Sequence, residues 1–360
     1  MNNLNKIAEH FCLKGNIKEI KPLGAGLIND SYKIATESGE PDYLLQRINH
    51  SIFRDVEGLQ RNIERVTAHI KGKLTAAGDP DADRKVLCPV FTPEGKSFYC
   101  DEEGNFWRIF VFIPDSISYD AVSPDLARQA GIAFGEFQSM LSDLPGEPLC
   151  ATIPNFHNME NRWASFEEAV KQNKAGRLSK VQDLVNELTV RAEEMCKIER
   201  MAREGKLIKR ITHCDTKVNN ILFDKKTDQI LCVVDLDTTM PGFVLSDVGD
   251  FIRTAVNKGA EDDTDLNKIG PDLAIFEAFI QGYLSTANAF LSQTERELLV
   301  FGGRLLTYMQ TVRFLTDYLD GDTYYKIKHK EHNLERSIAQ FTYLKRLEEN
   351  YETMCNMLKS

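Results

Sequence analysis

Two acids and one amide within residues 208–240 have the types and the spacing that phosphoryl transfer requires. The segment IKRITHCDTKVNNILFDKKTDQILCVVDLDTTM contains Asp215, then Asn220 five residues later, and Asp235 at the end of an apolar run. A carboxylate can orient an attacking hydroxyl and accept its proton, and a Mg²⁺ ion that bridges nucleotide phosphates takes hard oxygen ligands. We therefore predict Asp215 as the base and Asn220 and Asp235 as magnesium ligands.

The residues beside this acid would support the same chemistry. Lys217, two positions after Asp215, can approach the γ-phosphoryl oxygens and offset the charge that develops there. We expect His213 to fix the loop through hydrogen bonds without transferring a proton itself. Cys214 is adjacent to His213 in the sequence, so the two cannot easily face each other and a thiol nucleophile is not favoured.

Asp247 lies in the segment PGFVLSDVGD, which predicts a loop that enters a helix with Ser246 as its N-cap. Its carboxylate could cap that helix or accept hydrogen bonds from the backbone of the loop around Asp215. We interpret Asp247 as structural support. The short pattern H-x-D-x₄-N also occurs in loops without catalysis, but the strand, turn and strand that follow it favour a catalytic loop.

Composition and charge limit the classes of protein that this chain can represent. The chain has 360 residues, 42% hydrophobic and 27% charged, which suits a globular protein with two lobes. A net charge of −10 gives no footprint for nucleic acid or an anionic membrane, and no transmembrane span or secretory signal is visible. The eight cysteines are scattered without a C-x-x-C pair, which predicts reduced thiols in a cytoplasm. We also expect a monomer.

The segment IKEIKPLGAGLINDSYKIAT predicts two strands joined by a glycine turn, after a short helix at 4–14. Gly24 and Gly26 at the tip would let backbone N–H groups approach phosphates, and we add Asn29 to this nucleotide contact. A hairpin turn without a ligand is the alternative that the local pattern leaves open.

The next apolar strand, DYLLQRINHSIF, carries Arg47, which could grip phosphates through its planar guanidinium. The alternative is a solvated strand arginine. A helix is expected from 55 to 74, and either Glu57 or Glu64 on it might pair with Arg47, although each could equally be an ordinary surface acid.

The runs SFYC and FWRIFVFI, separated by DEEGN, predict a second hairpin. It leads into a proline-marked connector at Ile113, whose backbone would meet adenine if the connector is a hinge; a plain linker is the alternative. We expect an N-lobe at 1–113, a hinge at 114–118 and a C-lobe at 119–360.

The remainder of the chain predicts helices. SPDLARQAGIAFGEFQSML begins with Ser-Pro-Asp, an N-cap followed by proline at the first helical position. Further helices are expected at 159–172 and 179–204, and again from Ser246 to the end.

The late segment RFLTDYLDGDTYY gathers hydrogen-bonding groups with flat apolar faces, a combination that suits a sugar ring. We predict that Arg313, Asp317, Tyr318 and Tyr324 contact the substrate, together with Asp215. Arg313 and Asp317 are four residues apart, and on spacing alone a helix ion pair is the favoured alternative.

The chain as a whole resembles the aminoglycoside phosphotransferase-like superfamily, which includes choline and homoserine kinases. It is most similar to the bacterial N-acetylhexosamine 1-kinase branch of that superfamily. The resemblance is carried by LGAGLINDSYKI, LLQRIN, THCDTKVNN, VVDLDTTMPG, LSDVGDFIRT and RFLTDYLDGDTYY.

This resemblance implies an α+β, protein-kinase-like two-lobed fold with a small antiparallel N-lobe sheet plus helix and a larger, mostly helical C-lobe. It also implies ATP and Mg²⁺ as partners, with phosphoryl transfer to the anomeric hydroxyl of N-acetylglucosamine or N-acetylgalactosamine. The chain departs from a protein kinase in carrying Arg47 for the usual lysine and Cys214 for the loop arginine.

Other functions stay open at this point. The acceptor could be choline, which calls for an aromatic cage, or homoserine, or an aminoglycoside, which calls for an acidic groove. A nucleotide-binding regulatory pseudokinase is an alternative from another class, although base, amide and acid are all present. A sulfatase lacks support, because neither Cys-x-Pro-x-Arg nor Ser-x-Pro-x-Arg occurs.

Overall fold

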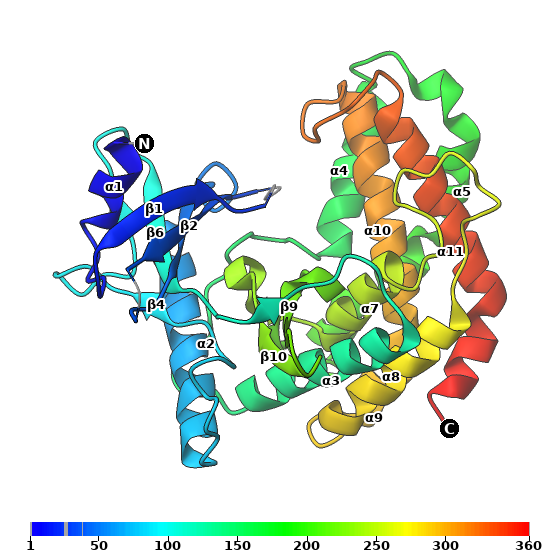
Figure 1. The fold of residues 1–360 in the computed structure, drawn as a ribbon. Helices are drawn as coiled ribbons and strands as arrows, with labels where there is room; N and C mark the ends of the chain where they lie inside the picture. The colour runs from blue at the N-terminus through cyan, green and yellow to red at the C-terminus, as the bar shows by residue number, and fades with distance from the viewer. Residues whose placement is uncertain (1, 25–27, 38, 360) are drawn as a thin grey trace. The chain divides into compact units, whose positions relative to one another are not determined.

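The computed structural model describes residues 2–24, 28–37 and 39–359, which divide into two compact units (Figure 1). The first unit comprises Met1–Ser118, Met140–Pro154 and Asn219–Met240. The second comprises Tyr119–Ser139, Asn155–Val218 and Pro241–Ser360. The lobe and hinge bounds expected from the sequence stay a prediction, since this division also assigns 140–154 and 219–240 to the first unit.

An antiparallel sheet dominates the first unit, and its strands follow the order β1-β2-β3-β6-β4, with β5 also pairing with β6. The strands are β1 (Ile17–Pro22), β2 (Asp30–Thr36), β3 (Tyr43–Ile48), β4 (Pro89–Val90), β5 (Tyr99–Cys100) and β6 (Phe106–Val111). The β5–β6 pairing, with Cys100 opposite Phe106, confirms the predicted second hairpin.

One face of this sheet is covered by α1 (Asn2–Ala8), which is shorter than the helix expected at 4–14. Ile7 and Ala8 share a buried cluster with Leu45 of β3 and Ile109 of β6. Because side chains alternate across a strand, the neighbours of Leu45 and Ile109 along their strands belong to the opposite face.

The helix expected at 55–74 is confirmed as α2 (Val56–Ala76). Asp55 is its N-cap, and the carboxylate accepts the N–H of Gly58 at 2.9 Å, which satisfies one of the open donors of the first turn. The buried apolar residues recur at helical spacing along one stripe: Leu59, Ile63, Val66 and Ile70.

A three-stranded sheet of order β10-β9-β7 completes the first unit. It consists of β7 (Ser116–Ile117), β9 (Ile221–Asp224) and β10 (Ile230–Val233), followed by the 3₁₀ turn η3 (Leu236–Thr238). The strand, turn and strand predicted after the 213–220 loop are therefore present.

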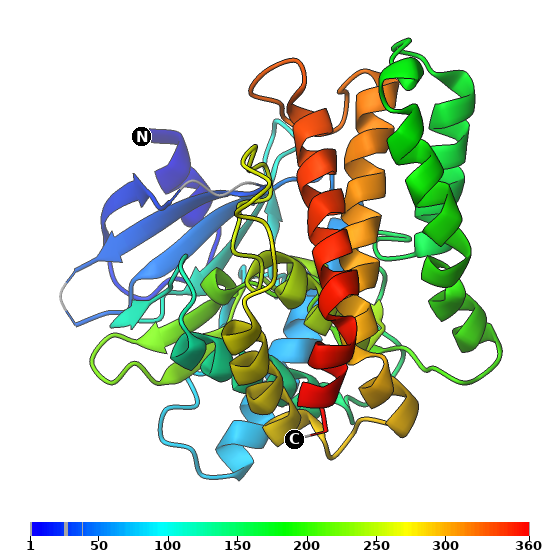
Figure 2. The same ribbon diagram turned by 90° about the vertical axis from the view of Figure 1, so that its right-hand side faces the viewer.

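The second unit is mostly helical (Figure 2). Its helices are α3 (Pro124–Leu141), α4 (Met159–Gln172), α5 (Gln182–Met195), α6 (Lys197–Arg203), α7 (Val244–Thr254), α8 (Leu273–Ala287), α9 (Gln293–Glu297), α10 (Leu299–Asp320) and α11 (His332–Met357). Short elements are η1 (Leu178–Lys180), η2 (Val218–Asn220), β8 (Arg210–Thr212) and β11 (Met240–Gly242), the chain passing between units within η2 and β11.

Helix boundaries in this unit follow the sequence signals with two exceptions. Ser123 caps α3 by accepting the N–H of Leu126 at 3.2 Å, and α4 has the expected bounds. The single helix expected at 179–204 is divided at Cys196 into α5 and α6. The predicted N-cap at Ser246 is wrong, because α7 begins at Val244 and no side chain caps it.

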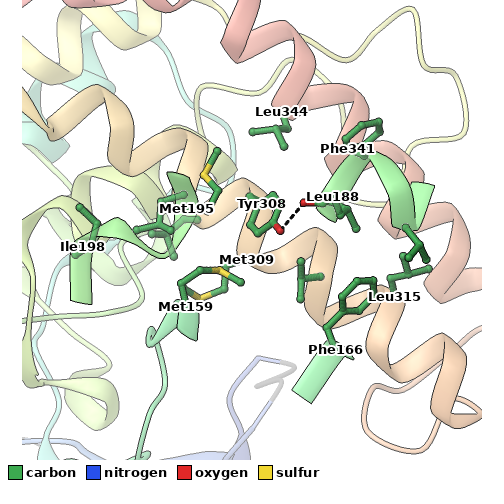
Figure 3. Packing of buried hydrophobic residues seen from close by; sticks show 14 of the residues in the cluster. Met159, Phe166, Leu188, Met195, Ile198, Tyr308, Met309, Leu315, Phe341 and Leu344 are labelled. Carbon is green, nitrogen blue, oxygen red and sulfur yellow. Dashed lines mark hydrogen bonds between the residues drawn. The ribbon is translucent and has the colours of Figure 1, made fainter. Parts of the chain in front are cut away.

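The core of the second unit lies around α10, which is buried on most sides. Figure 3 shows Tyr308 and Leu315 of α10 among side chains from α4, α5 and α11, and the Tyr308 hydroxyl donates to the carbonyl of Leu188 at 2.9 Å. In the part of the chain that the structure describes, no helix is both long and apolar enough to span a bilayer.

Candidate active site

The candidate residues fall in both units. The loop at 213–217 belongs to the second unit, where it follows β8, while Asn220 and Asp235 belong to the first. In the sequence, Asn220 follows Asp215 by five positions.

Asp247 of α7 holds the 213–217 loop by its backbone. Its carboxylate accepts the N–H of His213 and the N–H of Cys214, each at 2.8 Å, and Thr216 Oγ1 donates to its main-chain carbonyl at 2.5 Å. Burial raises the pKa of Asp247, and the charge and hydrogen bonds from His213 and Cys214 work in the opposite direction. The sequence left two roles open for this carboxylate, capping the helix or binding the loop backbone, and the structure shows the second.

Two glycines allow α7 to lie where Asp247 can reach the loop. A Cβ atom on Gly249 of α7 would come within 2.3 Å of the carbonyl oxygen of Gly302 in α10. A Cβ atom on Gly302 would in turn lie 2.1 Å from the carbonyl oxygen of Leu245. Only residues without a side chain permit two helix backbones to approach this closely.

Replacing Asp247 by alanine is expected to destabilise the protein and stop turnover. The change leaves three buried N–H donors without their acceptor, namely the backbone N–H groups of His213 and Cys214 and the side-chain amide of Gln138. Each unsatisfied donor costs about 1–3 kcal/mol, so we expect a loss of at least about 3 kcal/mol. The urea unfolding midpoint measures the loss. Asp263→Ala, which removes a surface acid of the same unit, serves as control, and equal midpoints for the two variants would contradict the assignment.

His213 supports the loop from within the core. It is fully buried, its Nδ1 accepts the N–H of Asp215 at 3.3 Å, and its ring meets the edges of Phe134 and Phe137. Cys214 has a positive φ of 62°, a conformation that a non-glycine residue adopts only when its surroundings hold it. Burial also raises the pKa of the Cys214 thiol, which agrees with the expectation that it is no nucleophile.

Lys217 pairs directly with the predicted base. Its Nζ lies 2.6 Å from Asp215 Oδ1. Burial disfavours the ammonium form, but the carboxylates of Asp215 and of buried Asp250 outweigh it and raise the pKa of Lys217. Lys217 is therefore a cation next to Asp215, while its approach to a phosphoryl group stays a prediction.

In the first unit, the pairing of β9 with β10 brings the two predicted metal ligands together. Val233 lies opposite Ile221, and the N–H of Val234 donates to the carbonyl of Asn220 at 2.9 Å, which places Asp235 one residue further on. Asp235 itself has φ 59° and ψ 57°, in the left-handed region. An amide oxygen and a carboxylate are hard donors that fit Mg²⁺.

Arg47 does not have the predicted surroundings. Its guanidinium binds Asp30, with Nε to Oδ2 at 2.8 Å, near the end of the β2–β3 pair, where both side chains are about half exposed. Among the described residues, Arg47 is paired with Asp30 and with neither Glu57 nor Glu64, for which an ordinary surface acid was the favoured interpretation. Arg47 is also registered opposite Trp107, on the face of the sheet that α1 covers. Its role as a phosphate ligand stays a prediction, with Asp30 as its partner within the protein.

The opposite face of the sheet carries a polar network that the sequence analysis missed. Arg108, which lies opposite Gln46, donates from Nε to Gln46 Oε1 at 3.0 Å and from Nη1 to Asp237 Oδ1 at 2.5 Å. Asn29 donates to Asp237 Oδ2 at 2.6 Å and accepts the N–H of Asn49 at 2.9 Å. The side chain of Asn29 is thus bound within the protein, and the nucleotide contact predicted for this residue stays a prediction.

The remaining nucleotide contacts stay predictions. Gly24 has φ +67° with open space at its Cβ position, as a glycine turn requires. Gly26 lies outside the described residues. Ile113 is buried, and its carbonyl already accepts the hydroxyl of Ser116 at 2.7 Å.

Two of the four side chains predicted to contact the substrate in the late segment, those of Asp317 and Tyr318, are buried and hydrogen-bonded within the second unit, and their contact with a substrate stays a prediction. Asp317 is buried and forms no pair with Arg313; its oxygens accept the N–H groups of Thr323, Tyr324 and Tyr325 and the amide of Asn333, all at 2.8–2.9 Å. Asp317 therefore fixes the turn after α10.

Tyr318 is the second of these two buried residues. Its side chain is fully buried, and its hydroxyl donates to Glu331 at 2.8 Å, so it packs inside the unit. Burial and the neighbouring Glu331 raise its pKa to about 12. Tyr324 is 69% exposed and stays a candidate.

Arg313 belongs to a cationic cluster with Arg162 and His157, which the sequence analysis did not single out. Arg313 lies over the rings of Phe156 and Tyr325 and donates to Gln310, while Arg162 donates only to the carbonyl of Phe156. Within the described residues, neither guanidinium has a carboxylate partner.

The third member of the cluster is a neutral imidazole. Burial, with Arg313 and Arg162 nearby, lowers the pKa of His157 to about 3. Its Nδ1 atom is buried without a hydrogen-bond partner among the described residues. The charge of Asp215, also in the second unit, raises the pKa of His157 by a smaller amount.

Comparison with known proteins identifies the class and the family. Residues 19–286 match the APH model, described as the phosphotransferase enzyme family, and this match covers most of the chain. The chain therefore belongs to the phosphotransferase enzyme family. Within its superfamily, the N-acetylhexosamine branch is a finer assignment that this match does not reach.

Solved structures have the same fold. Spectinomycin phosphotransferase APH(9)-Ia, in complex with ADP and spectinomycin, is 13% identical, covers 98% of each chain and has a TM-score of 0.57. An ethanolamine kinase from Plasmodium vivax is 16% identical over 90% of this chain and 82% of its own, with a TM-score of 0.54. Choline kinase from Cryptosporidium parvum Iowa II is 13% identical over 98% and 93%, with a TM-score of 0.51. The predicted α+β, kinase-like two-lobed fold is thereby confirmed.

Proposed function

We propose that this protein uses ATP to phosphorylate the anomeric hydroxyl of an N-acetylhexosamine, N-acetylglucosamine or N-acetylgalactosamine, giving the 1-phosphate. Family membership and the fold support the phosphotransferase part, and the ADP held by the spectinomycin enzyme supports ATP as donor. The observation that carries the acceptor part is the pair of arginines in the same unit as the base, Arg162 and Arg313, that lack a carboxylate partner among the described residues.

The chemistry assigned to the second unit is proton transfer. Asp215 would accept the proton of the anomeric hydroxyl as the oxygen forms its bond to the γ-phosphorus and the bond from that phosphorus to ADP breaks. His213 accepts the backbone N–H of Asp215, and Asp247 in turn accepts the backbone N–H of His213, so the base would be positioned before the acceptor arrives. Lys217, already beside Asp215, would offset charge on the phosphoryl oxygens.

The first unit would hold the nucleotide. Asn220 and Asp235 would bind Mg²⁺, and a bound Mg²⁺ would neutralise charge on the ATP phosphates. Gly24 and Gly26 would offer backbone N–H groups to the phosphates, and the backbone at Ile113 would meet adenine. Asn29 and Arg47 stay proposed members of this set, although their side chains already bind Asp237 and Asp30 within the protein.

The charge of the cationic cluster, which lies in the same unit as Asp215, supports a neutral acceptor. A cationic acceptor, such as choline, ethanolamine or an aminoglycoside, would bring its positive charge toward Arg162 and Arg313, and like charges in a partly buried site repel. A sugar with an N-acetyl group instead offers carbonyl and hydroxyl oxygens, which accept hydrogen bonds from guanidinium groups. Tyr324 could add a flat apolar face to the ring.

The test is ATP consumption by the purified protein with Mg²⁺ against a panel of acceptors. The panel contains both N-acetylhexosamines, galactose, glucose, choline, homoserine and kanamycin. We expect the highest kcat/KM with an N-acetylhexosamine. Turnover confined to choline, homoserine or kanamycin would move the acceptor to another class, and binding of ATP without any turnover would favour a regulatory nucleotide-binding protein.

Arg313→Met is expected to raise KM for the sugar with a smaller effect on kcat. A hydrogen bond to a charged group contributes about 1.5–3 kcal/mol, which corresponds to roughly 10- to 150-fold in binding. Arg346→Met, which removes an exposed arginine of α11, is the control. An unchanged KM in Arg313→Met would remove this residue from the acceptor site.

A further inference from the structure

Asp237 is a buried carboxylate two residues after the proposed metal ligand Asp235. Its Oδ1 lies 2.5 Å from Arg108 Nη1 and its Oδ2 lies 2.6 Å from Asn29 Nδ2. The side chains of Arg108 and Asp237 are only 3% and 4% exposed. Each oxygen of Asp237 therefore accepts a hydrogen bond from within the protein, which fixes the orientation of this carboxylate.

The two donors connect Asp237 to different parts of the sheet. Arg108 belongs to β6 and is held by Gln46 of β3 through the bond to its Nε. Asn29 lies immediately before β2, and its Oδ1 accepts the N–H of Asn49. The carboxylate of Asp237 therefore joins the glycine-turn hairpin and the centre of the sheet to η3.

The segment around Asp235 is also held at both ends. On one side, the N–H of Val234 donates to the carbonyl of Asn220. On the other, Asn62 of α2 donates from Nδ2 to the carbonyl of Thr239 at 3.2 Å. Between them, Asp235 occupies the left-handed region, which non-glycine residues rarely adopt and which persists only where the surrounding structure imposes it.

We propose that Asp237 is a positioning residue: held by Arg108 and Asn29, it keeps the backbone of Asp235 left-handed and so directs the Asp235 carboxylate toward a divalent cation. This inference rests on the proposed role of Asp235 as a metal ligand. It also predicts that cation affinity depends on Asn29, and hence on the hairpin that carries the glycine turn. Residues that orient metal ligands typically change metal affinity by about 10–100-fold when replaced.

The experiment measures Mn²⁺ binding directly, from the electron paramagnetic resonance signal of free Mn²⁺ in the presence of ADP, so that no turnover is needed. Asp237→Asn removes the charge at constant size, and we expect its Mn²⁺ Kd to rise about 10-fold or more. Asn29→Ala leaves the Arg108–Asp237 pair intact, and we expect a smaller rise of about 3-fold. With saturating Mg²⁺, both variants should recover much of the wild-type kcat.

The matched control is Arg84→Met, which breaks another ion pair of the same unit, between Arg84 and Asp224 of β9 at 2.8 Å. Its Mn²⁺ Kd should equal that of the wild type. Near-ultraviolet circular dichroism shows whether Asp237→Asn is folded. If this variant is unfolded, the Mn²⁺ Kd of Asn29→Ala tests the proposal in its place.

The outcomes separate the two levels of the account. Wild-type Mn²⁺ affinity in a folded Asp237→Asn or in Asn29→Ala, while Asp235→Asn loses binding, overturns the positioning role and leaves the proposed function standing. Wild-type affinity in Asp235→Asn as well means that the metal assignment itself fails.

Discussion

Asp215→Asn is expected to lower kcat by about 10²–10⁴ while leaving ATP binding nearly unchanged, because a positioned general base contributes a factor of this size. The amide keeps the shape of the side chain but cannot accept the proton of the attacking hydroxyl. The hydrogen bonds that hold the loop come from the backbone of His213, Cys214 and Asp215 and so persist in the variant. Initial rates and isothermal titration with ATP measure the two quantities.

A control separates the base from the ion pair that it forms. Lys217→Met breaks the 2.6 Å contact with Asp215 but keeps the carboxylate. If loss of the pair alone explained the effect, the two variants would be equally slow. Turnover near the wild-type rate in Asp215→Asn would remove Asp215 from the role of base.

Asp235→Ala is expected to lower kcat/KM for Mg·ATP by about 10³. A bound metal ion contributes several kcal/mol of charge stabilisation in phosphoryl transfer, and each 1.36 kcal/mol corresponds to a tenfold change in rate. The dependence of the initial rate on Mg²⁺ concentration should shift to higher values or fail to saturate. An unchanged Mg²⁺ dependence would refute the ligand assignment.

The backbone of Asp235 calls for a second variant. Alanine is strained at φ 59°, so Asp235→Ala changes both the ligand and the conformation. Asparagine tolerates the left-handed region, and Asp235→Asn therefore isolates the charge. Asp228→Asn, at another left-handed aspartate in the β9–β10 turn, is the control and should retain the wild-type Mg²⁺ dependence.

Local spacing was sufficient to predict the residues of the 213–220 loop and most helices. The residues from His213 to Asn220 lie close together in the chain, so their types and spacing can be recognised locally, and Ser123 and Asp55 form caps that are also local. The backbone of the loop is held in addition by Asp247, which lies 34 positions from His213. The start of α7 was misplaced because no side chain caps it, and the Ser246 signal had no competitor in the sequence.

Contacts between distant segments could not be derived in this way. Arg47 and Arg108 are both strand arginines, and only the register of β3 with β6 shows that Arg108 shares a face with Gln46 while Arg47 lies on the other. The bonds from Asn29 and Arg108 to Asp237 bridge 208 and 129 positions. The alternation of side chains along β3 could have assigned Gln46 and Arg47 to opposite faces of the sheet. Nothing in the local sequence indicates that Asp237 is the partner of Asn29 and Arg108.

The residues considered for the acceptor site show the same difference between local patterns and contacts of distant segments. Asp317 precedes a Gly-Asp turn by four residues, and four N–H donors compete for its carboxylate, so the helix ion pair with Arg313 does not form. Arg162 and His157 lie some 150 residues before Arg313 in the sequence, and only the folded second unit brings the three together.

The most direct test of the central claim is phosphorus NMR of a mixture of the protein, Mg·ATP and N-acetylglucosamine or N-acetylgalactosamine. We predict a new phosphomonoester signal, coupled to the anomeric proton, that grows as ATP is converted to ADP. A mixture that yields only ADP and inorganic phosphate, or a phosphate coupled to another carbon's proton, would contradict the proposal that this protein is an anomeric sugar kinase.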